Sequence, residues 1–504
     1  MPNANEDKLS TLSQVQHRAV SELLRVSPVA DDLARRFQAA GFSLALVGGS
    51  VRDALLGRLG NDLDFTTDAR PSDVLKIVRP WADAVWQVGI AFGTVGCQKR
   101  CPIDSNAGNS GKVESAASAG TDQAFQIEIT TYRSEAYDRT SRKPEVSYGD
   151  SIEEDLVRRD FTVNAMAVSL PEKEFIDPYG GLGDLAKGVL RTPGTPEASF
   201  SDDPLRMMRA ARFAAQLDFD VAPEVIAAMQ EMSARIDIVS AERVRDELSK
   251  LILSEFPRKG LTLLVETGLA DHVLPELPAL RLEYDEHHRH KDVYEHTLIV
   301  LEQAMALENG RPDLVLRLAA LLHDIGKPRT RRFEKDGRVS FHHHEVVGAK
   351  MAKKRMTALK YSNELVKDVS RLVELHLRFH GYGTGEWTDS AVRRYVRDAG
   401  PLLTRLHKLT RSDCTTRNKR RANALWRAYD GLEERIAQLQ EQEELDAIRP
   451  DLDGNQIMKI LGIGPGPVVG QAYTFLLELR LENGPMGQDA AVKALTDWWA
   501  KQSH

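Results

Sequence analysis

The sequence is poor in cysteine, in long apolar runs and in net positive charge, and each shortage narrows the choice of protein class. Three cysteines are too few for a disulfide framework, which fits a reducing cytoplasm. No unbroken apolar run could span a bilayer, and the polar start MPNANEDKLS does not resemble a signal peptide. The formal net charge of −7 argues against a nucleic-acid partner, although a basic stripe on one face can bind phosphates whatever the total charge. We therefore expect a cytoplasmic, multidomain and mostly helical protein.

A chain of 504 residues is too long for one compact core, so we expect three or four domains. The most informative stretch is LVGGSVRDALLGRLGNDLDFTTD, residues 46–68. An apolar run ending at Val47 predicts a strand, Gly48, Gly49 and Ser50 predict a tight turn, and the residues from Val51 predict a helix. Backbone N–H groups in such a turn can approach a phosphate closely, and the helix N-terminus favours an anion.

Charged side chains extend this pattern. Arg52 adds a cation beside the turn, and Asp62 and Asp64 follow on a predicted strand. Residues i and i+2 of a strand face the same way, so both carboxylates point into one space. Hard oxygen ligands beside a phosphate site suit Mg²⁺ and a nucleoside triphosphate. Glu128, in the predicted neighbouring strand QIEITTYR, is a candidate third carboxylate.

The ordered set GGSVRD, LLGR and DLDFTT resembles the polymerase-β-like nucleotidyltransferases, and closely the class II tRNA nucleotidyltransferases (CCA-adding enzymes) and bacterial poly(A) polymerases. Two later motifs, RRDFTVNAMA and IDPYGGLGDL, resemble the family's second and third motifs. The resemblance implies that Arg159, the second arginine of RRDFTVNAMA, contacts the incoming nucleotide.

The fourth motif, SDDPLRMMRAARFAAQL, contains a candidate base-reading pair. Asp203 and Arg206 are i, i+3 neighbours on one predicted helix face. A carboxylate accepts from an exocyclic amino group and an arginine donates to a ring nitrogen, so the pair fits C and A and mismatches U and G. The simpler alternative makes Asp203 only a helix cap. Arg209 and Arg212 continue the row and match family arginines placed for triphosphate or helix contacts, or are solvated surface.

Beyond residue 285 the composition shifts, and twelve of the fourteen histidines lie between His272 and His407. The set His296, His323, Asp324 and Asp413 resembles the metal ligands of HD-domain phosphohydrolases, which implies a transition metal. FHHHEVV and HLRFH are candidates for further ligands, with His344 the first choice, or for a polar loop. The HD fold also persists in proteins as a helical scaffold without activity.

We therefore predict an α+β fold: a polymerase-β-like nucleotidyltransferase head, a mixed sheet with helices, followed by an all-helical neck, HD body and tail. The reaction implied is template-independent addition of CCA to tRNA from CTP and ATP with Mg²⁺. Three alternative functions remain. The first is a poly(A) polymerase, although VGIAFGTVG stands where those enzymes typically carry a basic GRRF-like stretch. The others are an enzyme that adds only C or only A, and an HD phosphohydrolase with an RNA-binding head. The predicted domains are a head (25–170) with a disordered insertion (about 101–122), a neck with the nucleotide-selecting motif (171–282), an HD domain (283–430) and a tRNA-body-binding tail (431–504).

Overall fold

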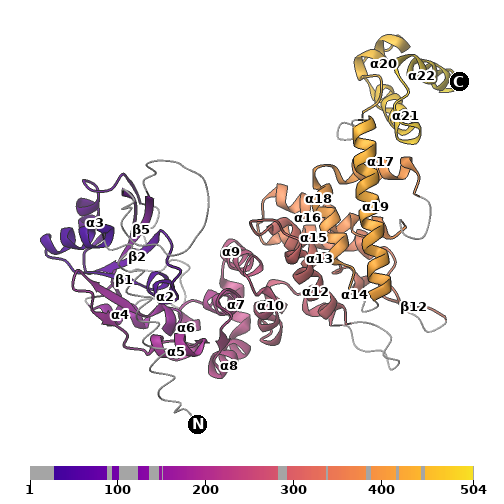
Figure 1. Ribbon diagram of the computed structural model, residues 1–504. Coiled ribbons are helices and arrows are strands. Elements are labelled where there is room, and N and C mark those ends of the chain that lie inside the picture. The colour runs from indigo at the N-terminus through magenta and orange to yellow at the C-terminus, as the bar shows by residue number, and fades with distance from the viewer. Residues whose placement is uncertain are drawn as a thin grey trace. The chain divides into compact units, whose positions relative to one another are not determined.

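The structure is a computed structural model of the 504-residue chain. It describes residues 28–87, 93–101, 123–134, 147–149, 151–281, 292–335, 339–381, 387–415, 419–443 and 449–502. These residues form two compact units (Figure 1). The first comprises residues up to Ser240 together with Ser254–His272, and the second comprises Ala241–Leu253 together with the chain from Val273 onward.

The first unit is built on a mixed seven-stranded sheet in the order β3-β4-β5-β2-β1-β8-β9. Neighbouring strands are antiparallel except β2 and β5, which are parallel. The central strands alternate: in β2 and β5 the apolar side chains are buried and the intervening acidic ones are exposed, as a half-buried strand requires. The strands are β1 (Leu44–Val47), β2 (Asp62–Thr67), β3 (Ala84–Trp86), β4 (Thr94–Cys101), β5 (Gln123–Thr131), β8 (Ala167–Leu170) and β9 (Phe175–Ile176).

Helices surround this sheet and continue into a helical region of the same unit (Figure 1). A first helix, residues 28–39, buries Leu33 and Phe37. The others are α2 (Gly49–Leu55), α3 (Pro71–Val78), α4 (Ile152–Val157), α5 (Gly181–Lys187), α6 (Pro196–Asp202), α7 (Leu205–Leu217), α8 (Pro223–Met232), α10 (Pro257–Glu266) and α11 (Leu269–Val273). Two small sheets pair β6 (Arg133–Ser134) with β7 (Ser147–Tyr148) and β10 (Val189–Leu190) with β11 (Asp220–Val221).

The second unit is almost entirely helical. At its centre lies α13 (Leu314–Leu322), whose residues from Leu316 to Leu322 are all buried, as expected of a helix that is apolar on every face. Its one buried charge, Arg317, is neutralised by Glu308 at 2.7 Å. Around it are α9 (Ala241–Ile252), α12 (Val293–Ala306), α14 (Lys327–Thr330), α15 (His344–Ala358), α16 (Asn363–Leu375), α17 (Asp389–Ala399), α18 (Leu403–Ser412) and α19 (Lys419–Glu443), and one hairpin of β12 (Arg332–Phe333) and β13 (Val339–Ser340).

The C-terminal helices of this unit have a small core of their own. It is formed by Leu452, Ile457, Ala472, Leu476, Ala491 and Leu495. These residues come from α20 (Gly454–Leu461), α21 (Pro467–Asn483), α22 (Gln488–Gln502) and the segment before α20. Short 3₁₀ helices lie elsewhere in the chain at Thr162–Asn164, Ser233–Ile238, Pro278–Leu280, Arg378–Gly381 and Gly400–Leu402.

The predicted α+β architecture, with a sheet-containing head followed by helices, is confirmed. Between α3 and β5, strands β3 and β4 pair antiparallel. Helix α3 begins with Pro71 at its first position and Arg70 as the preceding residue. Most of the insertion expected at 101–122 lies outside the described residues, and the predicted domain limits remain predictions. Among the described helices, none is long and apolar enough to cross a membrane.

Candidate active sites

Three carboxylates gather on one face of the first unit's sheet. Asp62 and Asp64 are exposed and alternate with buried residues along β2, so they point to the same side. Glu128 on β5 is the register partner of Asp64 across the parallel pair, and it is exposed in the same alternation. Residues in register on adjacent strands project to the same face. The fold therefore brings all three predicted carboxylates together.

The electrostatics of this cluster fit a cation-binding site. Neighbouring protein atoms partly desolvate Asp64, and together with the charges of Glu128 and Asp62 this raises the pKa of its carboxyl to about 6, although Arg159 and Arg52 counteract the shift. Protonation of Asp64 reduces the repulsion among the three carboxylates, and a bound divalent metal ion would reduce it in place of the proton. Carboxylate oxygens are the ligands that Mg²⁺ prefers in proteins.

Gly48 allows an arginine to approach the turn beside these carboxylates. It has φ 66° and ψ −127°, a conformation essentially restricted to glycine. A Cβ at this position would lie 2.6 Å from Nη1 of Arg159. Arg159 itself is held by Asp155, whose Oδ2 accepts from Nη2 at 2.9 Å and also from the hydroxyl of Thr66 on β2. Thus the predicted nucleotide-contacting arginine lies against the predicted phosphate turn.

Ser50 and Arg52 already have protein partners in the structure. The Ser50 hydroxyl accepts from the backbone N–H of Asp64 at 2.9 Å, which ties the turn to the metal-ligand strand. Arg52 is buried and donates to both carboxylate oxygens of Asp53 and to Oδ1 of Asn164. Ser50 therefore fixes the place of Asp64, and Arg52 presents a constrained positive charge near it.

Asp160 and Asn164 join these residues to α7, a role that was not predicted from the sequence. Asp160 is buried, accepts a hydrogen bond from Asn164 at 3.0 Å and forms an ion pair with Arg209 at 2.7 Å. Burial alone would raise the pKa of Asp160, but Arg209 and Asn164 outweigh it and hold the pKa below its usual value. Both residues lie within the RRDFTVNAMA motif, so the signal was present, but their partners are distant in sequence.

The Asp203 side chain contacts the start of α7. Its Oδ1 accepts from the backbone N–H of Leu205 at 3.1 Å, although Pro204 rather than Asp203 occupies the N-cap position of the helix. Arg206 is anchored by the hydroxyl of Ser199 at 2.8 Å and by the backbone carbonyl of Arg158. Arg206 is thereby held beside the second motif, and its relation to a base remains a prediction.

The other two arginines of this row differ in their surroundings. Arg209 belongs to the Asp160 network just described. The guanidinium carbon of Arg212 lies 4.0 Å from the centroid of the Phe213 ring, and its Nη1 donates to Gln216 at 3.1 Å. Arg212 is therefore placed by its own helix, whereas Arg209 is coupled to the second motif. Their contacts with a triphosphate remain predictions.

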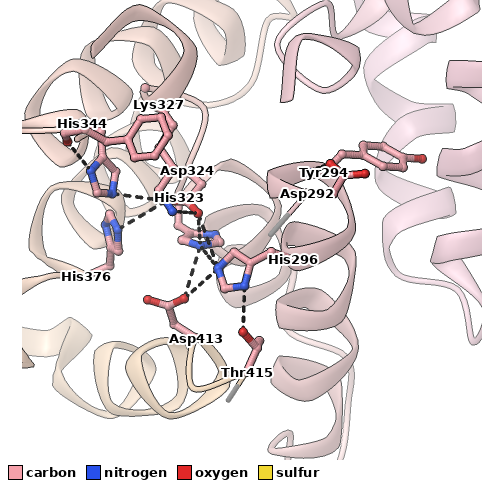
Figure 2. Close-up of polar contacts among 12 residues, drawn as sticks. Asp292, Tyr294, His296, His323, Asp324, Lys327, His344, His376, Asp413 and Thr415 are labelled. Atoms are coloured by element: carbon pink, nitrogen blue, oxygen red, sulfur yellow. Dashed lines mark hydrogen bonds and ion pairs between the residues drawn. The ribbon is translucent and has the colours of Figure 1, made fainter. Parts of the chain in front are cut away.

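The second unit contains a buried cluster of imidazoles and carboxylates, shown in Figure 2. Five helices each supply one end or turn to it: α12, α13, α15, α16 and α18. All four predicted ligands meet there, together with His344 and His376 from the two stretches that were candidates for further ligands. The ligand atoms form two groups, His296, His323 and Asp413, and Asp324, His344 and His376, each with its atoms within 4.8 Å of one another.

The histidine rings are oriented by backbone hydrogen bonds. Nδ1 of His323 lies 2.8 Å from the carbonyl oxygen of Ala320, and His344 and His376 make the same contact with Phe341 and Val373. An N–H at Nδ1 leaves the lone pair on Nε2, which in each case faces Asp324 (Figure 2). This tautomer is the one that binds a metal through Nε2.

The cluster has the charge balance of a cation site. Burial lowers the pKa of His323, but Asp324 and Asp413 outweigh it and raise the pKa to about 10. Burial and the neighbouring His323 instead lower the pKa of His376 to about 3, and its buried Nε2 has no hydrogen-bond partner among the described residues. Imidazole nitrogens with carboxylates are a donor set for transition metals, so the residues fit such an ion.

Gly326, in the HDIGK sequence, permits this arrangement. A Cβ there would lie 2.1 Å from the backbone oxygen of His344, so only glycine lets the turn after α13 approach the start of α15. Lys327 donates to Oδ2 of Asp324 at 2.6 Å and places a positive charge at the edge of the cluster.

Comparisons with known protein families match three parts of the chain. Residues 44–191 match the family described as "Poly A polymerase head domain", and residues 218–280 match "Probable RNA and SrmB- binding site of polymerase A". Residues 293–418 match "HD domain". The head match contains the carboxylate site, and the HD match contains the histidine cluster.

Curated relatives and solved structures agree with these matches. An A-adding tRNA nucleotidyltransferase of Deinococcus radiodurans is 37% identical over 70% of this chain and 80% of its own length. A CCA-adding enzyme of Streptococcus gordonii is 36% identical over 53% of this chain and 59% of its own length. The crystal structure of the Bacillus stearothermophilus CCA-adding enzyme in complex with CTP matches with a TM-score of 0.64 and 22% identity, over 95% of this chain and 98% of the other. At that identity the structural match shows a common fold.

Proposed function

The chain belongs to the tRNA nucleotidyltransferase family, and from this premise we propose that it adds CCA to the 3′ end of tRNA, without a nucleic-acid template, from CTP and ATP. The observation that carries the proposal is the set of three carboxylates, Asp62, Asp64 and Glu128, on one sheet face beside the Gly48 turn. With three cysteines and tRNA as substrate, we place the reaction in the cytoplasm.

In this proposal each residue has a defined task. Asp62 and Asp64 hold Mg²⁺, which when bound stabilises charge on the attacking and leaving oxygens of a phosphoryl transfer. The backbone N–H groups of the turn and Arg159 bind the triphosphate, while Asp155 keeps Arg159 in place. Positioning and electrostatics then account for most of the catalysis, as in other phosphoryl transfers.

Nucleotide selection is assigned to α7. Asp203 accepts from the amino group of C or A, and Arg206 donates to the adjacent ring nitrogen. The anchoring of Arg206 by Ser199 supports this assignment, because a fixed donor discriminates between base edges better than a mobile one. Because these two side chains read the base edge themselves, the proposed selection needs no template strand.

Removing single metal-ligand carboxylates tests the proposal. Asp62→Asn and Asp64→Asn should each abolish incorporation of CTP and ATP into tRNA while leaving the melting temperature near that of the wild type, because both side chains are exposed. Asp73→Asn on α3 is the matched control, since it removes a surface carboxylate that pairs only with Lys76 among the described residues. Full activity of either ligand variant would contradict the metal assignment.

The D. radiodurans relative gives specific support to a second possibility, an enzyme that adds only A. It matches a larger share of this chain than the S. gordonii CCA-adding enzyme does. An A-only enzyme extends tRNA that already ends in CC and leaves tRNA lacking CC unchanged. The two functions share the carboxylate site, so substrate choice rather than mutation separates them.

We also propose that the histidine cluster holds a transition metal and hydrolyses phosphate esters. The convergence of six candidate ligand residues from five helices supports metal binding, and the match to the HD domain supports hydrolysis as the activity of that metal. His323→Ala should lose bound metal, measured by elemental analysis, and any phosphatase or 2′,3′-cyclic phosphodiesterase activity, while tRNA extension continues. His342→Ala removes an exposed histidine nearby and should retain both. Unchanged metal content in His323→Ala would leave the HD region a scaffold.

A further inference from the structure

A groove of about 760 Å³ lies on the second unit between α15, α16 and the 3₁₀ turn Gly400–Leu402. Three exposed lysines line it, Lys350 and Lys353 on α15 and Lys367 on α16. Apolar side chains such as Val366 and Leu402 form part of its wall. We call it the lysine groove, after these three residues.

The lysine groove is separate from the histidine cluster. On α15 the buried residues are His344, Gly348, Ala352 and Met356, spaced four apart along one face. Lys350 and Lys353 lie between these positions on the exposed side of the same helix. The helix thus presents His344 to the cluster and its lysines to solvent, so neither predicted site uses the groove.

The lysines are available to an external anion. None of the three has an ion-pair partner among the residues that the structure describes. By contrast, the arginines of the groove are held by the protein: Arg371 donates to Glu374 at 2.7 Å and Arg397 to Asp398 at 3.1 Å. Five basic and three acidic residues line the groove, in a chain whose formal net charge is −7. A local positive excess in an acidic protein is the pattern of an anion-binding surface.

The composition of the groove favours a phosphate backbone over a protein partner. Lysine is depleted at protein–protein interfaces, because its mobile chain and strongly hydrated head are costly to bury there. At phosphates the same group binds as a mobile point charge and releases counterions. Lys350 and Lys353 are neighbours on one helical turn, and Lys367 on the adjoining helix widens the row, which suits successive phosphates of one strand.

We propose that the lysine groove binds the sugar–phosphate backbone of the RNA substrate, at a surface separate from the carboxylate site that performs the reaction. This inference rests on the proposed tRNA substrate and adds a contact surface for it. It predicts a sequence-independent and salt-dependent contribution to RNA affinity, with no contribution to nucleotide selection.

The test uses the full chain with Lys350→Ala, Lys353→Ala and Lys367→Ala combined. The affinity for tRNA is measured at several salt concentrations. We expect affinity to fall on the order of tenfold, and the slope of log K against log salt to fall by about 0.9 for each lost contact. The KM for CTP and the kcat at saturating tRNA should not change, because the carboxylate site is intact.

A control variant separates the groove from total charge. Lys76→Ala, Lys187→Ala and Lys354→Ala together remove the same charge from exposed positions outside the groove. An equal loss of tRNA affinity in this control variant overturns the assignment of the groove. Unchanged tRNA binding by the groove variant also overturns it and would leave the groove to a protein partner. If the wild type neither binds nor extends tRNA, the proposed function itself fails, an outcome distinct from both.

Discussion

Replacing Gly48 with alanine perturbs two features together, the backbone before α2 and the place of Arg159. The positive φ of 66° with ψ −127° costs a residue with a Cβ about 1–3 kcal/mol. The new Cβ would also meet Nη1 of Arg159 at 2.6 Å, so the guanidinium must move away from the turn. The variant should therefore be less stable and should also lose a contact to the triphosphate.

The kinetic effect can be estimated from the lost contact. A hydrogen bond to a charged group is worth about 1.5–3 kcal/mol, so kcat/KM for CTP and ATP should fall roughly 10- to 150-fold. Displacing Arg159 also removes one of the charges that lower the pKa of Asp64, so this pKa should rise above about 6. The acid limb of the pH–rate profile should then move to higher pH.

Gly41→Ala is the control for backbone strain. Gly41 has φ +82°, yet a Cβ there meets no atom within 4 Å. It should lose stability with almost no change in kcat/KM. The assay is single-nucleotide incorporation into tRNA for both variants, with melting temperatures measured in parallel. Equal kinetics in the two variants would refute the positioning of Arg159 by this turn.

Three further predictions address other residues of the two sites. Asp203→Asn should raise the use of UTP relative to CTP, because the amide can donate a hydrogen bond to the uracil carbonyl. An unchanged preference among the four nucleotides would leave Asp203 with a capping role only, since Asn caps a helix as well as Asp does. Glu128→Gln should lower the pKa of Asp64, so that Asp64 stays ionised to lower pH and the acid limb near pH 6 shifts downward, with a lower plateau rate. Gly326→Ala should push the backbone of His344 and reduce metal content without stopping tRNA extension; normal metal content would show that the turn can relax.

The carboxylate site was partly predictable from sequence because strand alternation is a local property. Asp62 and Asp64 had to share a face once a strand was assumed. The place of Glu128 depended on the register of a parallel pair whose strands are about sixty residues apart, and no local pattern fixes such a register. The network of Asp160 and Asn164 was missed for the same reason, since its partners Arg52 and Arg209 are brought near only by the fold.

The histidine cluster shows the same limit. Its ligands lie at the ends of helices spread over more than a hundred residues, so the motif resemblance was needed to group them. His376 begins the HLRFH stretch, which the sequence could name only as one candidate among several, and it is the fold that places its buried Nε2 4.0 Å from Asp324. Asp203 illustrates a partial case: its carboxylate accepts from the Leu205 N–H, as the simpler prediction of a cap implied, but Pro204 occupies the N-cap position of α7.

The most direct measurement is to sequence the products formed on defined tRNA ends. Transcripts lacking the terminal CCA, ending in C and ending in CC are each incubated with CTP, ATP, UTP or GTP alone and with CTP and ATP together. We predict completion of CCA on all three ends when CTP and ATP are both present, with addition stopping after one A. Extension only of the CC end would identify an A-only enzyme, and long A tails would identify a poly(A) polymerase. No extension of any end by the wild-type protein would contradict the account.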